Sequence, residues 1–245
     1  MNARLACETQ TNQYLEQTQL LDYSHPTITK LIAGHGWTTC KSQTELIDQI
    51  YTFVRDEIPY GYSESFTVNA SQVLLDGYGN CLSKSTLLMA LLRAVGIPCR
   101  FHASTISKVI YRGLLLPLSY RIARDQHYHA WVEVLFNNRW LELEGHIIDK
   151  PYLQKLQQRF PDYMGSFYGY GIAVLNFKNP DNRWQENHTY VQHKAVETDL
   201  GTFHTPDSFF SQFPKAGSYT KSFRYKTIIK RRLNHSITAM RNSKQ

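Results

Sequence analysis

Residues 82 to 95 restrict the fold more than any other part of the chain. Apolar residues dominate this segment and leave little polar surface; the larger ones are Leu82, Leu87, Leu88, Met89, Leu91, Leu92 and Val95. A helix that is apolar on all sides is stable only when other elements surround it. Asn80 is a good N-cap residue, and Gly96 followed by Pro98 ends the helix. The sequence therefore predicts a buried central helix that the other layers of the fold must cover.

Two further helices are predicted before the central one. Between residues 42 and 58 the apolar side chains fall on one face, at Leu46, Ile47, Ile50, Phe53, Val54 and Ile58. This is the spacing of an amphipathic helix. Ser42 and Glu45 are typical of a capping box at its start, and Pro59 helps to end it. A shorter helix is predicted over residues 69–76.

Three strands are predicted after the central helix, over residues 99–107, 128–136 and 139–144. The intervening residues 108–126 are expected to form an inserted loop or short helix. Asn137 and Asn138 separate the last two strands, and asparagine tolerates the positive φ that a two-residue hairpin loop requires. Helices followed by antiparallel strands predict an α+β fold.

The hairpin loop also fixes the register of the last two strands. It places Glu133 opposite Glu142, and like charges in directly opposed positions destabilise a sheet. We expect one of these glutamates to be exposed or paired with an arginine such as Arg139, and neither to be catalytic.

Cys81 is a candidate nucleophile because of its place in the pattern. It directly follows the N-cap Asn80, in the first turn of the central helix. The helix N-terminus stabilises a thiolate at this position. The alternative is that Cys81 is a small buried residue of the helix, as many free cysteines are.

The hairpin supplies two partners for such a thiolate. Its register places Trp131 opposite Glu144, and His129 lies two residues from Trp131 on the same face. Such diagonal neighbours are about 7 to 8 Å apart at the backbone, a gap that long side chains can close. The carboxylate of Glu144 can then orient the imidazole of His129, as the third member of a nucleophile, base and orienter arrangement does. Together with Cys81, these residues predict a cysteine-dependent acyl-transfer site.

Several blocks of the sequence resemble the bacterial transglutaminase-like superfamily, over roughly residues 40 to 145. The blocks are Asp76–Cys81, Leu87–Arg100, His129–Val134 and Trp140–Glu144, preceded by a segment that ends in Ile58–Tyr60. The resemblance implies a papain-like core in which the cysteine lies on the central helix, packed against an antiparallel sheet. It also implies a catalytic Cys, His and Asp, which fall here on Cys81, His129 and Glu144.

The third of these positions departs from the family pattern. The family usually has Asp where this chain has Glu144. The longer side chain can still accept the imidazole N–H, but it shifts the ring unless the strand register compensates. Asp149 is the nearest other candidate, but it lies beyond Gly145 and is expected to be off the strand, so Glu144 is kept as the third residue. Cys99, in the second block, is interpreted as structural.

The site also needs an oxyanion hole. The backbone N–H of Cys81 at the helix start would be one donor. The side chains of Gln72, Tyr60 and Tyr62 are all candidates for a second donor, and their spacing does not select among them.

No cofactor or metal is expected. His127 and His129 form a His-x-His pair on one face of a strand, but no third ligand stands at zinc-like spacing from them. The sequence contains no Gly-rich phosphate loop.

The charge of the chain is concentrated at its C-terminus. The chain has 27 Lys and Arg against 20 Asp and Glu, a formal net charge of +7, and residues 215–245 hold nine of the basic residues and no acidic one. The remainder is near neutral, so its composition argues against nucleic acid as a partner. The tail carries Ile228, Ile229 and Leu233 among its charges. It could be a helix that lies on an acidic partner, RNA or a membrane surface, or be only a solvated end.

Four regions are predicted: an N-terminal helical extension over residues 1–40, a transglutaminase-like core over 41–146, an aromatic-rich extension packed on the core over 147–214, and a basic tail over 215–245. The N-terminus shows no apolar signal-peptide stretch, and no CxxC pair occurs among Cys7, Cys40, Cys81 and Cys99. A cytoplasmic location with free thiols is therefore expected.

The expected function is acyl transfer from an amide or isopeptide bond of a peptide or protein substrate. Transfer to water would make a peptidase or amidase, which we favour because no second site for an amine is evident. Transfer to an amine would make a transglutaminase-type protein-glutamine acyltransferase. A non-catalytic binding module that keeps the fold is a further alternative. The sequence does not decide the oligomeric state.

Overall fold

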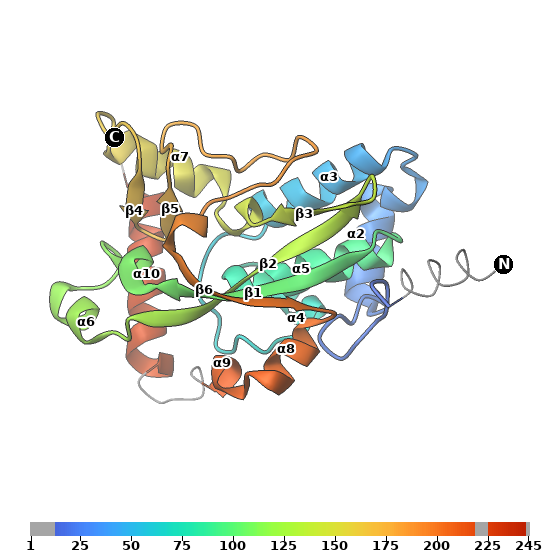
Figure 1. Cartoon of the computed structure of the whole chain (residues 1–245), viewed down its shortest axis with the longest axis horizontal. Helices are drawn as coiled ribbons and strands as arrows, with labels where there is room; N and C mark the ends of the chain where they lie inside the picture. The colour runs from blue at the N-terminus through green and yellow to red at the C-terminus, as the bar shows by residue number, and fades with distance from the viewer. Residues whose placement is uncertain (1–12, 219–224, 244–245) are drawn as a thin grey trace.

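A four-stranded antiparallel sheet packed against a layer of helices forms the centre of the protein (Figure 1). The computed structural model describes residues 13–218 and 225–243. Cys7, the start of the N-terminal extension and parts of the basic tail lie outside the described residues. The predicted α+β class is confirmed.

The sheet has the order β3-β2-β1-β6, and its inner strands β1 and β2 carry most of the pairing. The bounds of the strands are Cys99–Ser107 for β1, Gln126–Phe136 for β2, Arg139–Leu143 for β3 and Val196–Phe203 for β6. Every pair in this sheet is antiparallel. Strand β6 comes from the predicted extension, so the sheet joins two of the predicted regions.

Helix α5, Cys81–Ala94, is the central helix of the fold, and every residue from Leu82 to Arg93 is buried. It packs on β1 and β2 and is covered by α3, Gln43–Asp56, and α4, Ala70–Asp76. The prediction of a buried central helix is correct. Helix α2, Pro26–His35, and the short 3-10 helix η1, Trp37–Thr39, complete this side.

The cap of α3 differs in part from the prediction. Ser42 Oγ accepts the backbone N–H of Glu45 at 3.3 Å, as expected of an N-cap. The side chain of Glu45 instead accepts a hydrogen bond from Gln49 Nε2 at 3.0 Å. Gln49 lies one turn further along the same helix, so the carboxylate bonds within the helix rather than back to the cap.

The hairpin forms in the predicted register. Asn137 and Asn138 have φ of 47° and 59°, and Glu133 lies opposite Glu142. Strand β3 ends at Leu143, however, and Glu144 has helical angles, with φ −93° and ψ −28°. The expected strand pairing of Glu144 is therefore wrong, because the chain turns into a short helix immediately after β3.

The insertion between β1 and β2 holds two short helices, η2, Lys108–Tyr111, and α6, Pro117–Ile122. It projects from the end of the sheet at which β2 begins (Figure 1). The prediction of a loop or short helix is correct.

The residues after β3 build a second hydrophobic core beside the first. They form η3, Gly145–Ile147, α7, Lys150–Arg159, the hairpin of β4, Phe167–Gly169, and β5, Ile172–Val174, and η4, His193–Ala195. Tyr60 and Tyr62 from the upstream chain are buried in this core. Cys81 packs against both cores, so it lies at their junction.

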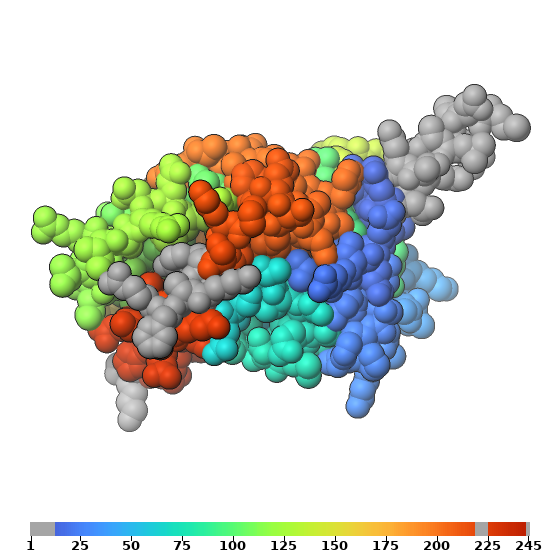
Figure 2. Space-filling model, turned by 90° about the horizontal axis from the view of Figure 1, so that it is seen from below, coloured from blue at the N-terminus to red at the C-terminus, as the bar shows by residue number. Residues whose placement is uncertain are grey.

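The C-terminal segment packs on both cores. It contains α8, Pro206–Gln212, α9, Pro214–Ser218, the π-helix η6, Tyr225–Ile229, and α10, Lys230–Arg241. Helices α8 and α9 pack into the first core. Leu233, Ile237 and Met240 of α10 are buried in the second core, whereas Ile228 is exposed. Ser236 donates to the carbonyl of Leu114, and α10 lies directly beside the insertion in the view of Figure 2. Much of the predicted apolar stripe of the tail is thus used within the protein.

Among the described residues, no helix combines the length and the hydrophobicity that crossing a bilayer requires.

Candidate active site

The start of α5 presents Cys81 on a capped helix terminus. Asn80 Oδ1 accepts the backbone N–H groups of Leu82 and Ser83 at 3.1 and 3.2 Å, and Ser83 Oγ accepts the N–H of Asn80 at 3.0 Å. This reciprocal cap satisfies three N–H groups and does not use the N–H of Cys81. The cap therefore leaves that N–H as a donor beside the thiol.

Gly79 allows the turn before the helix to pack tightly. A Cβ at this position would lie 2.6 Å from Ser83 Oγ, so a larger residue would displace the cap. The backbone of Gly79 bonds to Pro59 and Gly61 on the neighbouring segment, at 3.0 and 2.9 Å. These contacts bring residues 59–62 alongside Cys81.

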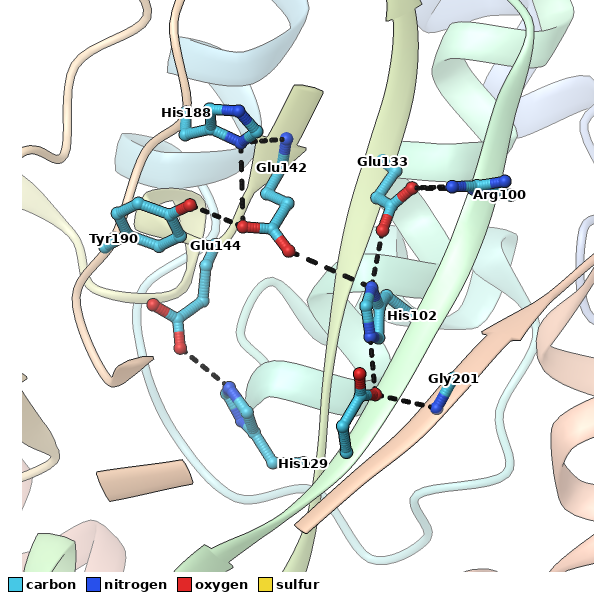
Figure 3. A network of polar contacts seen from close by, with 10 residues as sticks. Arg100, His102, His129, Glu133, Glu142, Glu144, His188, Tyr190 and Gly201 are labelled. Carbon is cyan, nitrogen blue, oxygen red and sulfur yellow. Dashed lines mark hydrogen bonds and ion pairs between the residues drawn. The ribbon is translucent and has the colours of Figure 1, made fainter. Parts of the chain in front are cut away.

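His129 and Glu144 form a buried hydrogen bond, as predicted. His129 Nε2 lies 2.8 Å from Glu144 Oε1, and both side chains are fully buried (Figure 3). His129 comes from β2, and Glu144 comes from the residue after β3. The side chain of Glu144 thus compensates for the early end of the strand. Asp149, the alternative candidate, instead caps α7 by accepting the N–H of Tyr152.

The second oxygen of Glu144 is held by backbone groups. Glu144 Oε2 accepts the N–H groups of Val191, Gln192 and His193 at 2.8, 3.0 and 3.0 Å. Burial alone would raise the pKa of Glu144, but the bond to His129 and these backbone donors hold it below its ordinary value. The carboxylate is therefore ionised over the physiological range.

Sequence reasoning missed these three donors. The N–H groups belong to the backbone, and backbone groups are the same for nearly every residue type. The residue types of this segment gave no signal for the interaction.

Cys81 and His129 interact electrostatically. Burial opposes protonation of His129, but its interactions with Cys81 and with Glu144 outweigh this effect and raise the pKa of the imidazole to about 9. His129 Nδ1 is buried and makes no regular hydrogen bond within the described part of the chain. Catalytic hydrogen bonds are often poorly aligned before substrate binds, so a loose contact between Cys81 and His129 is compatible with a catalytic pair.

Two of the candidate oxyanion donors lie beside Cys81, and the third does not. The hydroxyl oxygens of Tyr60 and Tyr62 are 2.8 Å apart in the buried second core. Burial raises the pKa of both phenols, and the charge of Cys81 raises it further. Gln72 is exposed and donates to Asp76 at 2.7 Å. Gln72 is therefore not placed to be the second oxyanion donor.

A chain of charged groups runs across the same face of the sheet (Figure 3). Glu133 accepts from Arg100 Nε at 2.6 Å and bonds His102 Nδ1 at 2.5 Å, and His102 Nε2 bonds Asp199 at 2.8 Å. Burial opposes protonation of His102, but its two carboxylate partners raise its pKa. The arginine that neutralises Glu133 is thus Arg100 of β1, not Arg139 as expected, because β1 lies on the other side of β2.

His102, Glu133 and Glu142 place one ligand atom each within 4.8 Å of one another, a spacing that could hold a metal ion. Their atoms are already engaged: Arg100 binds Glu133, and Tyr190 donates to Glu142 at 2.5 Å. A cation would have to displace these partners. The predicted His-x-His pair is not part of this cluster, since His127 bonds the carbonyl of Arg124 at 3.0 Å.

Cys99 is fully buried in β1, and its thiol donates to the carbonyl of Met89 at 3.6 Å. Burial raises the pKa of this thiol to about 11, although Arg93 opposes the effect. A thiol with such a pKa is largely protonated and unreactive at neutral pH. The structural interpretation of Cys99 agrees with this environment.

Comparison with known proteins identifies the central part of the chain. Residues 32–145 match the sequence model of the transglutaminase-like superfamily. The resemblance seen in the sequence is confirmed over these residues. A comparison with curated proteins finds no match.

Two solved structures are similar in part. A candidate cysteine protease from Cytophaga hutchinsonii has a TM-score of 0.47 and 13% identity, covering 81% of this chain and 48% of that one. Red sea bream transglutaminase has a TM-score of 0.32 and 15% identity, covering 55% of this chain and 26% of that one. The chain thus spans about half of the first protein and about a quarter of the second.

Proposed function

Since residues 32–145 match the sequence model of the transglutaminase-like superfamily, we propose that the protein is a cysteine-dependent acyl-transfer enzyme that acts on amide or isopeptide bonds of a peptide or protein. The observation that carries the proposal is the buried hydrogen bond between His129 and Glu144, with Cys81 coupled to the same imidazole. Burying a charged pair is costly unless the geometry is well satisfied. A nucleophile, a base and an orienting carboxylate in this order are what acyl transfer needs.

In the first half-reaction, the Cys81 thiolate attacks the carbonyl carbon of the substrate and forms a C–S bond. The oxygen becomes negative and accepts the N–H of Cys81. Of the paired hydroxyls of Tyr60 and Tyr62, one donates within the pair, and the proton of the other is available to the same oxygen. The C–N bond then breaks as the His129 imidazolium gives its proton to the leaving nitrogen, which leaves a thioester.

In the second half-reaction, the neutral His129 takes a proton from water as the water oxygen attacks the thioester carbon. The C–S bond breaks, the carboxylic acid leaves, and the thiolate and imidazolium are restored. Glu144 keeps the imidazole in one orientation throughout. We propose water rather than an amine as the acceptor, which makes the protein a peptidase or amidase.

The pH range of the reaction follows from the ion pair. The pKa of His129 is about 9, so the imidazolium that protonates the leaving nitrogen persists to mildly alkaline pH. We expect the rate to fall as the pH rises through about 9. A profile of kcat/KM against pH measures this limb.

The test combines thiol labelling with product analysis. Wild-type protein and the Cys81→Ala and Cys40→Ala variants are treated with iodoacetamide over a pH series, and carbamidomethylation of each cysteine is followed by peptide mass spectrometry. Cys40 is a matched control, since its half-buried thiol also lies next to a helix. Fast labelling at neutral pH should be confined to Cys81, since a free cysteine reacts mainly near or above pH 8.5.

Products are then measured with blocked peptides that contain an internal glutamine or an isopeptide bond, with and without a primary amine. New amino groups, released ammonia and amine-adduct masses report cleavage, deamidation and transfer. Cleavage or deamidation that Cys81→Ala loses supports the proposal. A dominant amine adduct would make the protein a transglutaminase-type transferase, and ordinary thiol reactivity without turnover would make it a binding module.

A further inference from the structure

We propose that residues 191–193 are a positioning segment that holds the catalytic carboxylate of Glu144 through the backbone. The segment lies outside the matched family region, which ends at residue 145. The inference rests on the proposed function and goes beyond it. It makes the aromatic-rich extension over residues 147–214 part of the active site.

The two oxygens of the Glu144 carboxylate have different partners. Oε1 faces His129, and Oε2 accepts three consecutive N–H groups, from Val191, Gln192 and His193. Successive backbone N–H groups that converge on one oxygen form a concave anion site. Three donors fix the position of Oε2, and the rigid carboxylate then fixes the direction of Oε1.

These separate partners of Oε1 and Oε2 explain why a glutamate can replace the aspartate of the family pattern. Strand β3 ends at Leu143, and the next residue already has helical angles. An aspartate at residue 144 would be shorter by one carbon–carbon bond, roughly 1.5 Å. From the same backbone position it could reach the imidazole or the three N–H groups, but not both. The side-chain length and the segment therefore match each other.

The segment is itself fixed to both cores. Thr189 pairs with the end of β3, with the N–H of Thr189 on the carbonyl of Glu142 at 2.8 Å and the N–H of Glu144 on the carbonyl of Thr189 at 3.0 Å. On the other side, the N–H of Ala173 bonds the carbonyl of Val191 at 2.9 Å, and Gln192 Nε2 donates to the carbonyl of Gly171 at 2.6 Å. The donors are thus held in place before any substrate binds.

The experiment loosens the segment without removing its N–H groups. Gln192→Met keeps the length of the side chain and removes its bond to Gly171. Gln157→Met is the matched control, since Gln157 is a partly buried glutamine of the same extension whose Nε2 donates to the carbonyls of Phe177 and Lys178. Both variants are measured for kcat, KM, the pH profile of Cys81 carbamidomethylation by iodoacetamide, and thermal unfolding.

We expect Gln192→Met to lower kcat about tenfold with little change in KM, because a small misplacement of a catalytic group acts on the transition state. The step in the labelling profile at which His129 loses its proton should move to lower pH, as should the alkaline limb of kcat/KM, since the displaced carboxylate stabilises the imidazolium less. A purely structural role would lower the unfolding temperature of both variants and leave the profile in place. Equal kcat and equal profiles for the two variants would overturn the proposal.

The variant Glu144→Asp is a second test of the proposal and does not depend on residue 192. If the segment positions the longer side chain, this variant should lose about a hundredfold in kcat, although aspartate is the usual residue of the family. Retention of wild-type kcat would also overturn the proposal.

The labelling data separate the two proposals. If Cys81 of the wild type labels fast but no amide is cleaved, the proposed function fails. The positioning segment is then still tested by the shift of the labelling profile. If the wild type cleaves amides and Gln192→Met matches Gln157→Met throughout, the positioning fails and the function stands.

Discussion

Two regions of the molecule contribute to the candidate site in different ways. The region from Gly79 to Glu144 supplies the side chains that would react, on a capped helix and a hairpin. The region after residue 145 supplies backbone donors at residues 191–193 and the salt bridge of Arg241 with Asp149. The first region acts through its residue types, whereas the second acts through where its chain is placed. Substitutions in the two regions should therefore fail in different ways.

The largest expected effect tests the first region. His129→Gln removes the base while the three backbone donors still hold Glu144, so we expect kcat to fall about 10⁴-fold with the fold preserved. Turnover of a blocked peptide measures the loss in kcat, and urea unfolding checks that the fold is preserved. Activity within tenfold of the wild type would show that the hairpin does not supply the base.

An intermediate effect, on the pH dependence of stability, is expected from His146, which lies where the two regions meet in the chain. His146 is fully buried, with Nδ1 on the carbonyl of Leu143 at 2.7 Å, and burial lowers its pKa to about 3. The unfolded state binds the proton from about pH 6.5 downward and the folded state only near pH 3, so stability is lost as the pH falls between these values.

We expect the free energy of unfolding to fall by about 2 kcal/mol more in the wild type than in His146→Asn between pH 7 and pH 5. Asparagine keeps an N–H donor but does not titrate. Urea unfolding at the two pH values measures the difference. Parallel losses in both proteins would show that His146 is not the group that titrates.

A smaller effect tests the second region. Arg241 of α10 binds Asp149 at 2.6 Å, and Asp149 is 1% exposed. Arg241→Met leaves this carboxylate with only its backbone donors, so we expect a loss of about 1.5 kcal/mol in the free energy of unfolding. Arg231→Met, at an exposed position of the same helix, should change it by less than about 0.5 kcal/mol. Equal effects would show that the salt bridge does not contribute to stability.

The smallest effect sharpens the comparison at the hairpin. Asn137 has a φ of 47°, which a β-branched residue adopts only with strain. Asn137→Val should cost about 1 kcal/mol of stability, and Asn137→Gly should cost little. The denaturant midpoints of the two variants measure these losses of stability. A valine variant as stable as the wild type would contradict the proposal that the loop conformation fixes the hairpin.

The two sides of β2 show why the sequence predicted some contacts and not others. The register of β2 with β3 follows from a two-residue loop, so Glu133 is opposite Glu142 as predicted. The register of β2 with β1 is set across an insertion of many residues, which leaves the alignment to packing. The sequence therefore predicted that one of these glutamates could pair with an arginine, but not that Arg100 of β1 would be this arginine.

By itself, the sequence determined the buried helix α5, its cap at Asn80, the hairpin and the approach of His129 to Glu144. These features depend on spacings of a few residues, which local geometry converts directly into positions. Only the tertiary structure decided that residues 191–193 bind the second oxygen of Glu144 and that α10 packs into the second core. Those contacts join positions far apart in the chain through backbone atoms and a shared apolar interior, and neither leaves a pattern in the residue types.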